Sequence, residues 1–486
     1  MITGCRNAPD STGNKTLLPD ISDLDVSENL VKIYAERRHD LMAKIGNGIV
    51  VLRSDNGYDG GRHEFRAANN FYYLTGFAQQ GSLLVLAKDP SYPYRLYLGE
   101  KSIREAIYTG EVPEADIIMN TFKPDTISSA KEFVNDIEKN IQAGTLVYTD
   151  FTDLLLKDNL LKTVKKLNAS DKIIRDIAPL INEMRVHKND FEVSRIQKAI
   201  DITGEAFVNA CRICRPGMYE FEIEAMIEYN YLKYGSPMPA FESIVASGPN
   251  AVTLHYSAND RKMEAGDLLL LDFGAEYGYY CADITRTIPV NGKFTGEQKD
   301  IYELVLKAQK AAITGMIPGV PLIAGHNKST EIIVQGLYEL GLITDPESKW
   351  QKKFYILYPI SHYLGMDVHD VGDYGVPDSL YRQKFIDGTA SGRLLEKGMV
   401  LTVEPGLYFR RNGLSQLFEL FGKETTQEEI RTFIDKVTPV YEKYKNIGIR
   451  IEDDVLITDS GNIVLSKNIP KEIDEIERIW FKKKPN

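Results

Sequence analysis

The sequence has no hydrophobic run long enough to cross a membrane. Its longest apolar stretches, SLLVLA and LLLL, are far shorter than the roughly 20 residues that span a bilayer. Residues 1–28 also lack the apolar core of a signal peptide, although ITGC at residues 2–5 has the pattern of a lipoprotein cleavage site without its hydrophobic segment. We therefore expect no membrane partner and a cytoplasmic location.

Cysteine is scarce, because four residues in a chain of 486 are too few for a disulfide framework. Cys211 and Cys214 form a C-x-x-C pattern late in a predicted helix, and no second pair completes a zinc site. We interpret them as two ordinary helix cysteines. This cysteine usage fits a reducing cytoplasm.

An excess of positive charge is also missing. The formal net charge is -11 and the pI is near 5.4, so no basic face is expected. The sequence has no glycine-rich phosphate loop of the G-x-x-x-x-G-K-[ST] type. We therefore expect no nucleic-acid partner.

The chain does have enough material for more than one domain. With 486 residues, 43% apolar and 26% charged, it is globular and too long for one ordinary core, so two domains are expected and three are possible. We predict a polar tail over residues 1–27 and an α/β domain over residues 28–180, where short apolar runs alternate with helical patterns. Over residues 181–480 we predict an α+β domain of helices and antiparallel hairpins.

The segment GDLLLLDFGAEYGYYCADITRTIPV predicts a β-hairpin that brings two aspartates together. Gly278 can adopt the positive φ that a tight hairpin turn requires. If the turn is centred between Tyr277 and Gly278, Asp272 faces Asp283 with Cβ atoms roughly 5 Å apart. A bulge of one residue would change this register.

Two carboxylates placed opposite each other repel, unless one is protonated or a cation lies between them. Asp272 follows four consecutive leucines, so its charge is expected to be partly buried, where an unpaired charge is costly. A cation site is therefore the favoured interpretation. A solvated surface pair is the alternative.

Two glutamates end strand-like runs farther along the chain. Glu404 in MVLTVEPGLYF precedes Pro405, which favours an extended backbone. In IGIRIEDDVLIT, strict alternation puts Arg450 and Glu452 on one face, so Glu452 has a cationic neighbour. Taken singly, each glutamate is more simply an ordinary solvated strand-end residue. Together with the aspartates they become candidate metal ligands.

Four stretches follow one another in a distinctive order: LLDFGAEYGYYCADITRT, SHYLGMDVHDVG, LTVEPGLYF and GIRIEDDVLITDSGN. They resemble the pita-bread metallopeptidases, specifically the aminopeptidase P and prolidase branch. FRAANNFYYLTGF at residues 65–77 is similar to a segment of that branch's N-terminal domain. The resemblance implies an aminopeptidase P-type α/β N-terminal domain followed by an α+β pita-bread catalytic domain of the creatinase and aminopeptidase kind.

The resemblance also implies a centre of two divalent metal ions per chain. The ligands carried over to this sequence are Asp272, Asp283, His362, Glu404 and Glu452. Four carboxylates offset the charge of two dications, and an oxygen-rich shell with one imidazole suits Mn²⁺ best. Zinc, cobalt and iron are the alternatives.

Catalytic roles follow from the same resemblance. His255 and His369 are expected to bind substrate and shuttle protons, with a structural loop histidine as the alternative. An Xaa-Pro bond has no amide hydrogen, so its nitrogen must be protonated to leave. Glu404 is expected to take a proton from the attacking water, and Arg450 to hold Glu452 or a substrate carboxylate.

The implied function is a dinuclear-metal exopeptidase, an Xaa-Pro aminopeptidase, whose substrates are peptides with proline at the second position. An Xaa-Pro dipeptidase, or prolidase, is the main alternative. A metal-free binding or interaction module of the same fold is a remote one. The resemblance further suggests a homodimer or homotetramer.

One departure concerns the pocket for the residue after the scissile bond. Members of the family commonly have a histidine and a glycine four and three residues before the metal-binding histidine, where this chain has Tyr358 and Pro359. Tyr358 can still donate a hydrogen bond, but it changes the shape and titration of the pocket. We expect metal binding to survive this change.

A second feature is the long interval between Glu404 and Glu452. It contains TTQEEIRTFIDKV, with a capping-box start and apolar residues at helical spacing, namely Ile430, Phe433, Ile434 and Val437. We predict an extra helix on the rim of the catalytic domain. Core packing is the favoured use, and a limit on substrate length or a subunit contact is the alternative.

Overall fold

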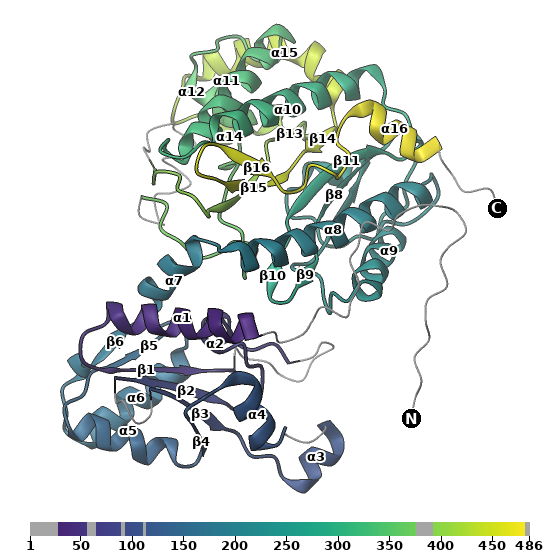
Figure 1. Cartoon of the computed structure of the whole chain (residues 1–486). Coiled ribbons are helices and arrows are strands. Elements are labelled where there is room, and N and C mark those ends of the chain that lie inside the picture. The colour runs from purple at the N-terminus through teal and green to yellow at the C-terminus, as the bar shows by residue number, and fades with distance from the viewer. Residues whose placement is uncertain (1–27, 56–64, 89–92, 110–112, 376–391, 482–486) are drawn as a thin grey trace, which may run out of the picture.

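The computed structural model describes residues 28–55, 65–88, 93–109, 113–375 and 392–481. It shows an N-terminal domain built on one mixed sheet and a C-terminal domain built on small antiparallel sheets (Figure 1). The tail predicted for the first 27 residues lies outside the described residues.

The N-terminal sheet has the strand order β4-β3-β2-β1-β5-β6. β2 runs antiparallel to both β1 and β3, and the other neighbours are parallel. The strands are β1 (Ile49–Arg53), β2 (Leu83–Ala87), β3 (Tyr94–Leu98), β4 (Thr126–Ser129), β5 (Val147–Thr149) and β6 (Ile174–Asp176).

Alternation along β1 explains why helices cover both faces of this sheet. Val50 and Leu52 pack with Leu41 of α1 on one face, whereas Ile49 and Val51 pack with α5 and α6 on the other. The predicted α/β architecture is therefore confirmed. Its helices are α1 (Glu28–Lys44), α2 (Asn69–Thr75), α3 (Ile103–Thr109), α4 (Ala115–Phe122), α5 (Phe133–Gln142), α6 (Leu154–Lys166) and the 3₁₀ turn η2 (Asp171–Ile173).

The described part of the C-terminal domain contains small sheets, all antiparallel, with the orders β11-β8-β7, β10-β9, β12-β15-β16 and β13-β14. Their strands are β7 (Ile244–Ser247), β8 (Leu268–Phe273), β9 (Glu276–Tyr277), β10 (Tyr280–Cys281), β11 (Ile284–Pro289), β12 (Val400–Val403), β13 (Gly406–Tyr408), β14 (Gly448–Arg450), β15 (Asp453–Ile457) and β16 (Asn462–Val464). The prediction of antiparallel hairpins among helices is confirmed.

Helices pack around these sheets, and local sequence fixes where the long ones begin. Asn189 and Glu192 form a capping box at the start of α8, and Cys214 caps its end shortly before a proline. The helices are α7 (Ala178–Val186), α8 (Asp190–Ile213), α9 (Glu220–Lys233), α10 (Gly296–Gly315), α11 (Ile323–Glu339), α12 (Lys349–Tyr355), α14 (Leu417–Phe421), α15 (Gln427–Tyr444) and α16 (Ile473–Phe481), with 3₁₀ turns η3 (Gly248–Val252) and η4 (Leu414–Gln416).

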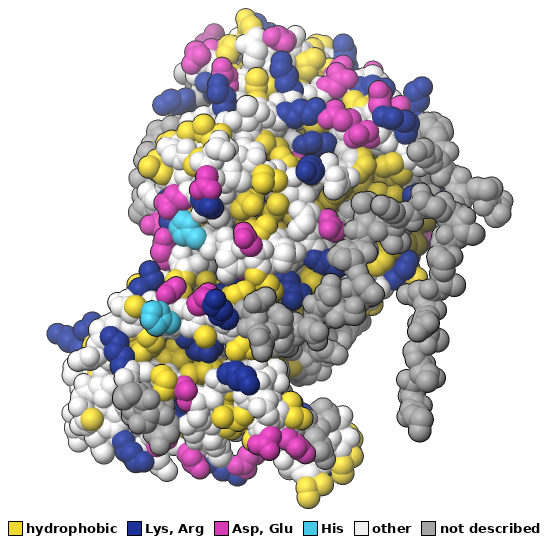
Figure 2. Space-filling model, in the orientation of Figure 1, with side chains coloured by type: hydrophobic (Ala, Val, Ile, Leu, Met, Phe, Trp, Pro, Cys, Tyr) yellow, Lys and Arg dark blue, Asp and Glu magenta, His cyan; other side chains and the backbone are white. Residues whose placement is uncertain are grey.

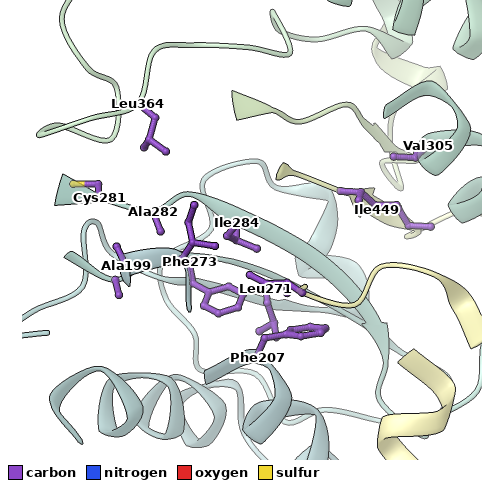
Figure 3. Close-up of a cluster of buried hydrophobic side chains, with 14 of the residues drawn as sticks. Ala199, Phe207, Leu271, Phe273, Cys281, Ala282, Ile284, Val305, Leu364 and Ile449 are labelled. Atoms are coloured by element: carbon purple, nitrogen blue, oxygen red, sulfur yellow. The ribbon is translucent and has the colours of Figure 1, made fainter. Parts of the chain in front are cut away.

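A buried apolar cluster holds the strand that carries Asp272. Phe207 of α8 lies against Leu271 and Phe273 of β8, with Ile449 of β14 and Val305 of α10 in the same cluster (Figure 3). All five side chains are fully buried. Truncating such a side chain to alanine typically costs about 2–5 kcal/mol, so this cluster fixes β8 firmly.

Several expectations can be placed on the described structure. The predicted boundary between residues 180 and 181 falls inside α7, and the division of the chain at that residue stays a prediction. Cys211 lies in α8 with Cys214 at its end, and both are buried, as expected of helix cysteines.

Surface features agree with the composition. On the face drawn in Figure 2, acidic and basic side chains are interspersed and do not gather into one basic patch. None of the helices in the described part of the chain combines the length and the apolar character that a membrane span requires.

Candidate metal centre

The hairpin that leads from Asp272 to Asp283 differs in register from the prediction. Asp272 pairs with Thr285, and Tyr277 pairs with Tyr280, so the turn lies one position later than expected. Gly278 and Tyr279 both have positive φ, at 55° and 73°. The sequence did not reveal that Tyr279 would accept this conformation, which its ring supports by stacking on Tyr72 at a centroid distance of 3.5 Å.

The predicted direct pairing of Asp272 with Asp283 is therefore wrong. The prediction that both aspartates lie on one side of the hairpin is correct. Asp283 lies two residues before Thr285, the partner of Asp272, so the aspartates are diagonal neighbours on one face of the hairpin. Burial raises the pKa of Asp283 well above its usual range, and repulsion from Asp272, Asp454 and Glu404 adds to this. The expected crowding of carboxylates is thus present.

His362 reaches the same place from the segment between α12 and β12. Its backbone is tied to Thr402 of β12, because Thr402 N donates to His362 O at 3.0 Å. Its Nδ1 lies 3.0 Å from Tyr363 O, which can only accept, so Nδ1 carries the hydrogen. Nε2 is left as a lone-pair donor, 3.4 Å from Asp283 Oδ2 and 3.7 Å from Glu404 Oε1.

The two glutamates follow strands that meet this pocket. Glu404 comes between β12 and β13, and its backbone N–H donates to Ile360 O at 2.9 Å. Glu452 follows β14, and its N–H donates to Thr285 O at 3.0 Å while its Oε2 accepts from Thr285 Oγ1 at 2.7 Å. The backbone thus fixes both carboxylates beside the hairpin.

The donor atoms converge. One ligand atom each from Asp283, His362 and Glu452 lie within 4.8 Å of one another. Among the described residues, Asp272 Oδ1 and Glu452 Oε1 are buried without a hydrogen-bond partner. A buried carboxylate oxygen with no partner is costly, and a cation in this pocket would satisfy both.

The raised pKa values of the acids also indicate that the site favours a bound cation. Burial raises the pKa of Glu404 to about 7, although His362 and Arg450 act to lower it. Burial also raises the pKa of Glu452 well above its usual range, and Asp283, Glu404 and Asp272 raise it further. In the absence of a cation the pocket therefore disfavours full ionisation of these acids, and a dication offsets that cost. The residues present fit a divalent metal.

Arg450 is buried at the edge of the pocket. Its Nη2 donates to Asp272 Oδ2 at 2.5 Å, so the hydrogen bond goes to Asp272 and not to Glu452, the partner suggested by alternation. The alternation breaks because β14 ends at Arg450 and Glu452 turns toward the hairpin. Nη1 donates to Tyr408 Oη at 2.7 Å and Nε to Thr285 Oγ1 at 3.1 Å.

The two additional histidines lie on the open side of this group. The ring of His369 is 4.2 Å from that of His362, and part of its surface is open to solvent. Partial shielding from water, together with His362 and His255, lowers the pKa of His369 to about 4. His255 therefore lies close enough to His369 to lower its pKa. The side chain of His255 is exposed. Both face solvent beside the cluster, where a substrate can reach them.

Tyr358, which stands where the resemblance leads us to expect a histidine, lies next to Glu404. Its hydroxyl donates to Glu404 O at 3.0 Å and lies 2.9 Å from Tyr408 Oη. Since Arg450 donates to Tyr408, a chain of hydrogen bonds runs from Asp272 through Arg450 and the two tyrosines to the backbone of Glu404.

Sequence reasoning missed three residues of this site. Thr285 Oγ1 donates a hydrogen bond to Glu452, and Tyr408 Oη accepts one from Arg450. Asp454 Oδ2 accepts a hydrogen bond from the backbone N–H of Asp283 at 3.2 Å. Alternation from Asp283 could have placed Thr285 on the same face. No pattern in the sequence indicates that Tyr408 and Asp454 lie here.

The extra helix predicted in the long interval is α15. Thr426 and Glu429 form its capping box, and Ile430, Phe433 and Val437 are buried. Phe433 contacts Trp350 of α12 with ring centroids 4.9 Å apart. The favoured use of this helix, core packing, is confirmed.

Two sequence profiles match the chain. Residues 194–459 match the profile described as metallopeptidase family M24. Residues 34–148 match the profile described as the aminopeptidase P N-terminal domain. The two matches fall on the two domains of the fold.

Individual proteins are similar over most of the chain. An Xaa-Pro aminopeptidase of Haemophilus influenzae is 34% identical, over 86% of this chain and 89% of its own length. Xaa-Pro aminopeptidase 3 of Homo sapiens is 30% identical, over 92% of this chain and 85% of its own length. The structure of aminopeptidase P from E. coli with the inhibitor Pro-Leu has a TM-score of 0.79 at 29% identity, covering 93% of this chain and 98% of that one.

Proposed function

The chain belongs to metallopeptidase family M24, with the aminopeptidase P N-terminal domain, and from this premise we propose how it removes the first residue of a peptide whose second residue is proline. It is a metallo-exopeptidase of the Xaa-Pro aminopeptidase type. The observation that carries the proposal is the convergence of ligand atoms from Asp283, His362 and Glu452 within 4.8 Å.

We propose that two divalent ions would be held here by the side chains of Asp272, Asp283, His362, Glu404 and Glu452. The oxygen-rich donor set with a single imidazole favours Mn²⁺ over metals that prefer thiolates. Such ions, when bound, polarise a carbonyl oxygen and acidify water.

Glu404 is the proposed proton acceptor for the attacking water. Its carboxylate lies beside the other proposed ligands, with Oε1 3.7 Å from His362 Nε2, so a water held at the centre would be within its reach. Its position is held by the backbone bond to Ile360 and by Tyr358 on its carbonyl. Arg450 orients Asp272 through a short, largely buried hydrogen bond from its Nη2 to Asp272 Oδ2.

Protonation of the leaving nitrogen is assigned to the histidines. The nitrogen of an Xaa-Pro bond carries no hydrogen, so it leaves only after it gains one. His369 and His255 lie beside the cluster and are open to substrate. The proton that Glu404 takes from the water would pass through one of these imidazoles to the leaving nitrogen, and the other would hold the substrate carbonyl. Tyr358 shapes the adjoining pocket for proline.

A peptide assay with added Mn²⁺ tests this function. Xaa-Pro-Xaa and Xaa-Pro peptides are compared for the wild type, for Asp283→Asn, and for Asp201→Asn, a partly buried aspartate of α8 that bonds Gln197. We expect cleavage of the tripeptides, loss with Asp283→Asn, and full activity with Asp201→Asn. Full activity of Asp283→Asn contradicts the site, and cleavage of dipeptides alone makes the chain a prolidase.

Assembly and location complete the proposal. We propose a homodimer or homotetramer, and exposed apolar side chains on α9, such as Phe221 and Leu232, offer contact surface. Sedimentation velocity measures this directly, and a monomer at micromolar concentration contradicts it. Buried thiols without a disulfide framework support a cytoplasmic location, which cell fractionation tests.

A further inference from the structure

Arg66 of the N-terminal domain is bonded to two separate segments of the C-terminal domain. Its Nε donates to both carboxylate oxygens of Glu276, at 2.9 and 2.8 Å. Its Nη2 donates to the carbonyl oxygen of Met366 at 3.1 Å, and Nη1 to Asn69 Oδ1 at 2.7 Å. The guanidinium thus uses all three nitrogens, two of them across the domain boundary.

Each segment that Arg66 holds carries residues of the candidate centre. Glu276 lies in β9, within the hairpin between Asp272 and Asp283. Met366 lies in the loop between His362 and His369. Figure 1 shows the β9 and β10 hairpin at the end of the C-terminal domain that adjoins α1 and α2. Arg66 therefore bridges the carboxylate hairpin and the histidine loop.

Neighbouring contacts support the same bridge. Asn69 Nδ2 donates to Met366 O at 3.3 Å, and the N–H of Ala67 donates to Tyr279 Oη at 2.9 Å. The ring of Tyr72 stacks on that of Tyr279 at the hairpin turn. Hairpin and loop are also joined directly, since Cys281 N donates to Gly365 O at 2.8 Å.

We propose that Arg66 is a positioning residue for the metal centre, through which the N-terminal domain holds the hairpin and the histidine loop at the spacing that metal binding requires. The pair is sheltered, with side-chain exposures of 19% for Arg66 and 8% for Glu276. Charged, multiply bonded pairs of this kind are stronger and more directional than surface pairs. The inference rests on the metal centre proposed above and assigns part of its affinity to the N-terminal domain.

A purely structural role for Arg66 makes a different prediction, and the chain offers a matched control. Arg53 forms a fork with Asp153 through two hydrogen bonds of 2.9 Å, with side-chain exposures of 22% and 17%. Both residues belong to the N-terminal domain. Loss of that pair destabilises the domain without touching hairpin or loop.

The test is calorimetric titration of the metal-free full-length chain with Mn²⁺. Arg66→Ala is expected to weaken Mn²⁺ binding by about tenfold, the lower end of the loss seen when a direct partner of a metal ligand is removed, because Arg66 acts through the hairpin and the loop that carry the ligands. Arg53→Ala is expected to keep the wild-type affinity within about twofold. Thermal scans add a second readout, since Mn²⁺ should raise the Tm of Arg66→Ala less than that of Arg53→Ala.

Glu276→Gln serves as the second variant, because it removes the charge from the hairpin end and keeps the side-chain shape. Glu276→Gln is also expected to weaken Mn²⁺ binding. If Arg66→Ala does not fold, the Mn²⁺ affinity of Glu276→Gln tests the proposal in its place. Wild-type affinity in either folded variant, or an equal loss in Arg53→Ala, overturns the proposal. A wild type that does not bind Mn²⁺ overturns the metal centre itself, which is a distinguishable result.

Discussion

Tyr358 lies beside the candidate metal centre, at a position where the resemblance leads us to expect a histidine. The hydroxyl bonds the backbone carbonyl of Glu404 and contacts Tyr408, at the end of the hydrogen-bond chain that begins at Asp272. None of these bonds uses a carboxylate oxygen of Glu404. The tyrosine therefore fixes the backbone position of Glu404 and does not occupy its carboxylate oxygens.

Tyr358→Phe is expected to keep Mn²⁺ affinity and lower kcat/KM for Xaa-Pro-Xaa peptides by about fivefold to thirtyfold. The variant loses the hydrogen bond to Glu404 O and the one with Tyr408 Oη, and each neutral hydrogen bond is worth about 1 kcal/mol, or a factor of about five. The matched control is Tyr355→Phe, because its hydroxyl also donates to a backbone carbonyl, that of Leu342 at 2.9 Å. Steady-state kinetics and Mn²⁺ titration check both variants, and a Tyr358→Phe protein that no longer binds Mn²⁺ contradicts this account.

At the scale of single residues, the sequence indicated that the four acids and His362 lie at one site, but it did not indicate most of the residues that hydrogen-bond to them. Asp272, Asp283, Glu404 and Glu452 end or flank strands, and motif resemblance placed them with His362; their role as ligands stays a prediction. The register failed because Tyr279 takes a backbone conformation that tertiary stacking supports. Partners such as Tyr408 come from distant strands, and local patterns carry no information about them.

Among the elements, α15 is the helix that the sequence predicted in the long interval between Glu404 and Glu452, and it has a structural use. Its apolar face lies under α12 and α14, where Trp350 contacts both Phe421 and Phe433. Its outer face is charged and exposed. The helix therefore stabilises the C-terminal domain by burial.

Phe433→Ala is expected to lower the free energy of unfolding by about 3–5 kcal/mol, through lost burial and the cavity left behind. The control Lys436→Ala changes an exposed residue of the same helix and should shift the value by less than about 0.5 kcal/mol. Urea denaturation monitored by circular dichroism measures both. A stable Phe433→Ala protein with altered preference for peptide length would favour the rim role instead.

Elements with strong local signals were predictable, and short ones were not. The capping boxes of α8 and α15 and the leucine run of β8 are visible in the sequence. β13 and β14 have three residues each and exist because they pair with each other around the centre. Tertiary pairing decides such strands, so sequence alone does not delimit them.

For the molecule as a whole, the candidate centre links stability to pH. Burial raises the pKa of Glu404 from 4.5 to about 7. The folded metal-free chain therefore keeps this proton to higher pH than the unfolded chain does, so the unfolded chain binds fewer protons between these values. Stability consequently falls as pH rises from about 4.5 to about 7.

In the presence of EDTA, the free energy of unfolding of the wild type is expected to fall over this range by up to about 3 kcal/mol more than that of Glu404→Gln. Glu428→Gln, an exposed change on α15, should keep the wild-type slope. Urea titrations at several pH values check this. If the free energy of unfolding falls equally steeply with pH in the wild type and in Glu404→Gln, burial does not raise the pKa of Glu404.

The two-domain architecture and the family were predictable from the whole chain, and both are confirmed. The predicted activity, an Xaa-Pro aminopeptidase, agrees with relatives of that name over most of the sequence. The contacts between domains were not predictable, since Arg66 and Glu276 are 210 residues apart and no periodicity joins them. Metal identity, assembly and location stay predictions.

The central claim is that carboxylates from separate strands, with one histidine, hold two divalent ions. Its most direct test is the number of Mn²⁺ ions per chain after reconstitution and gel filtration, measured by inductively coupled plasma mass spectrometry on the wild type and Asp283→Asn. The account predicts two ions for the wild type and fewer than about one for the variant, because Asp283 is a proposed ligand in the group of atoms that lie within 4.8 Å of one another. A wild type with fewer than about one ion, or a variant that retains two, would contradict it.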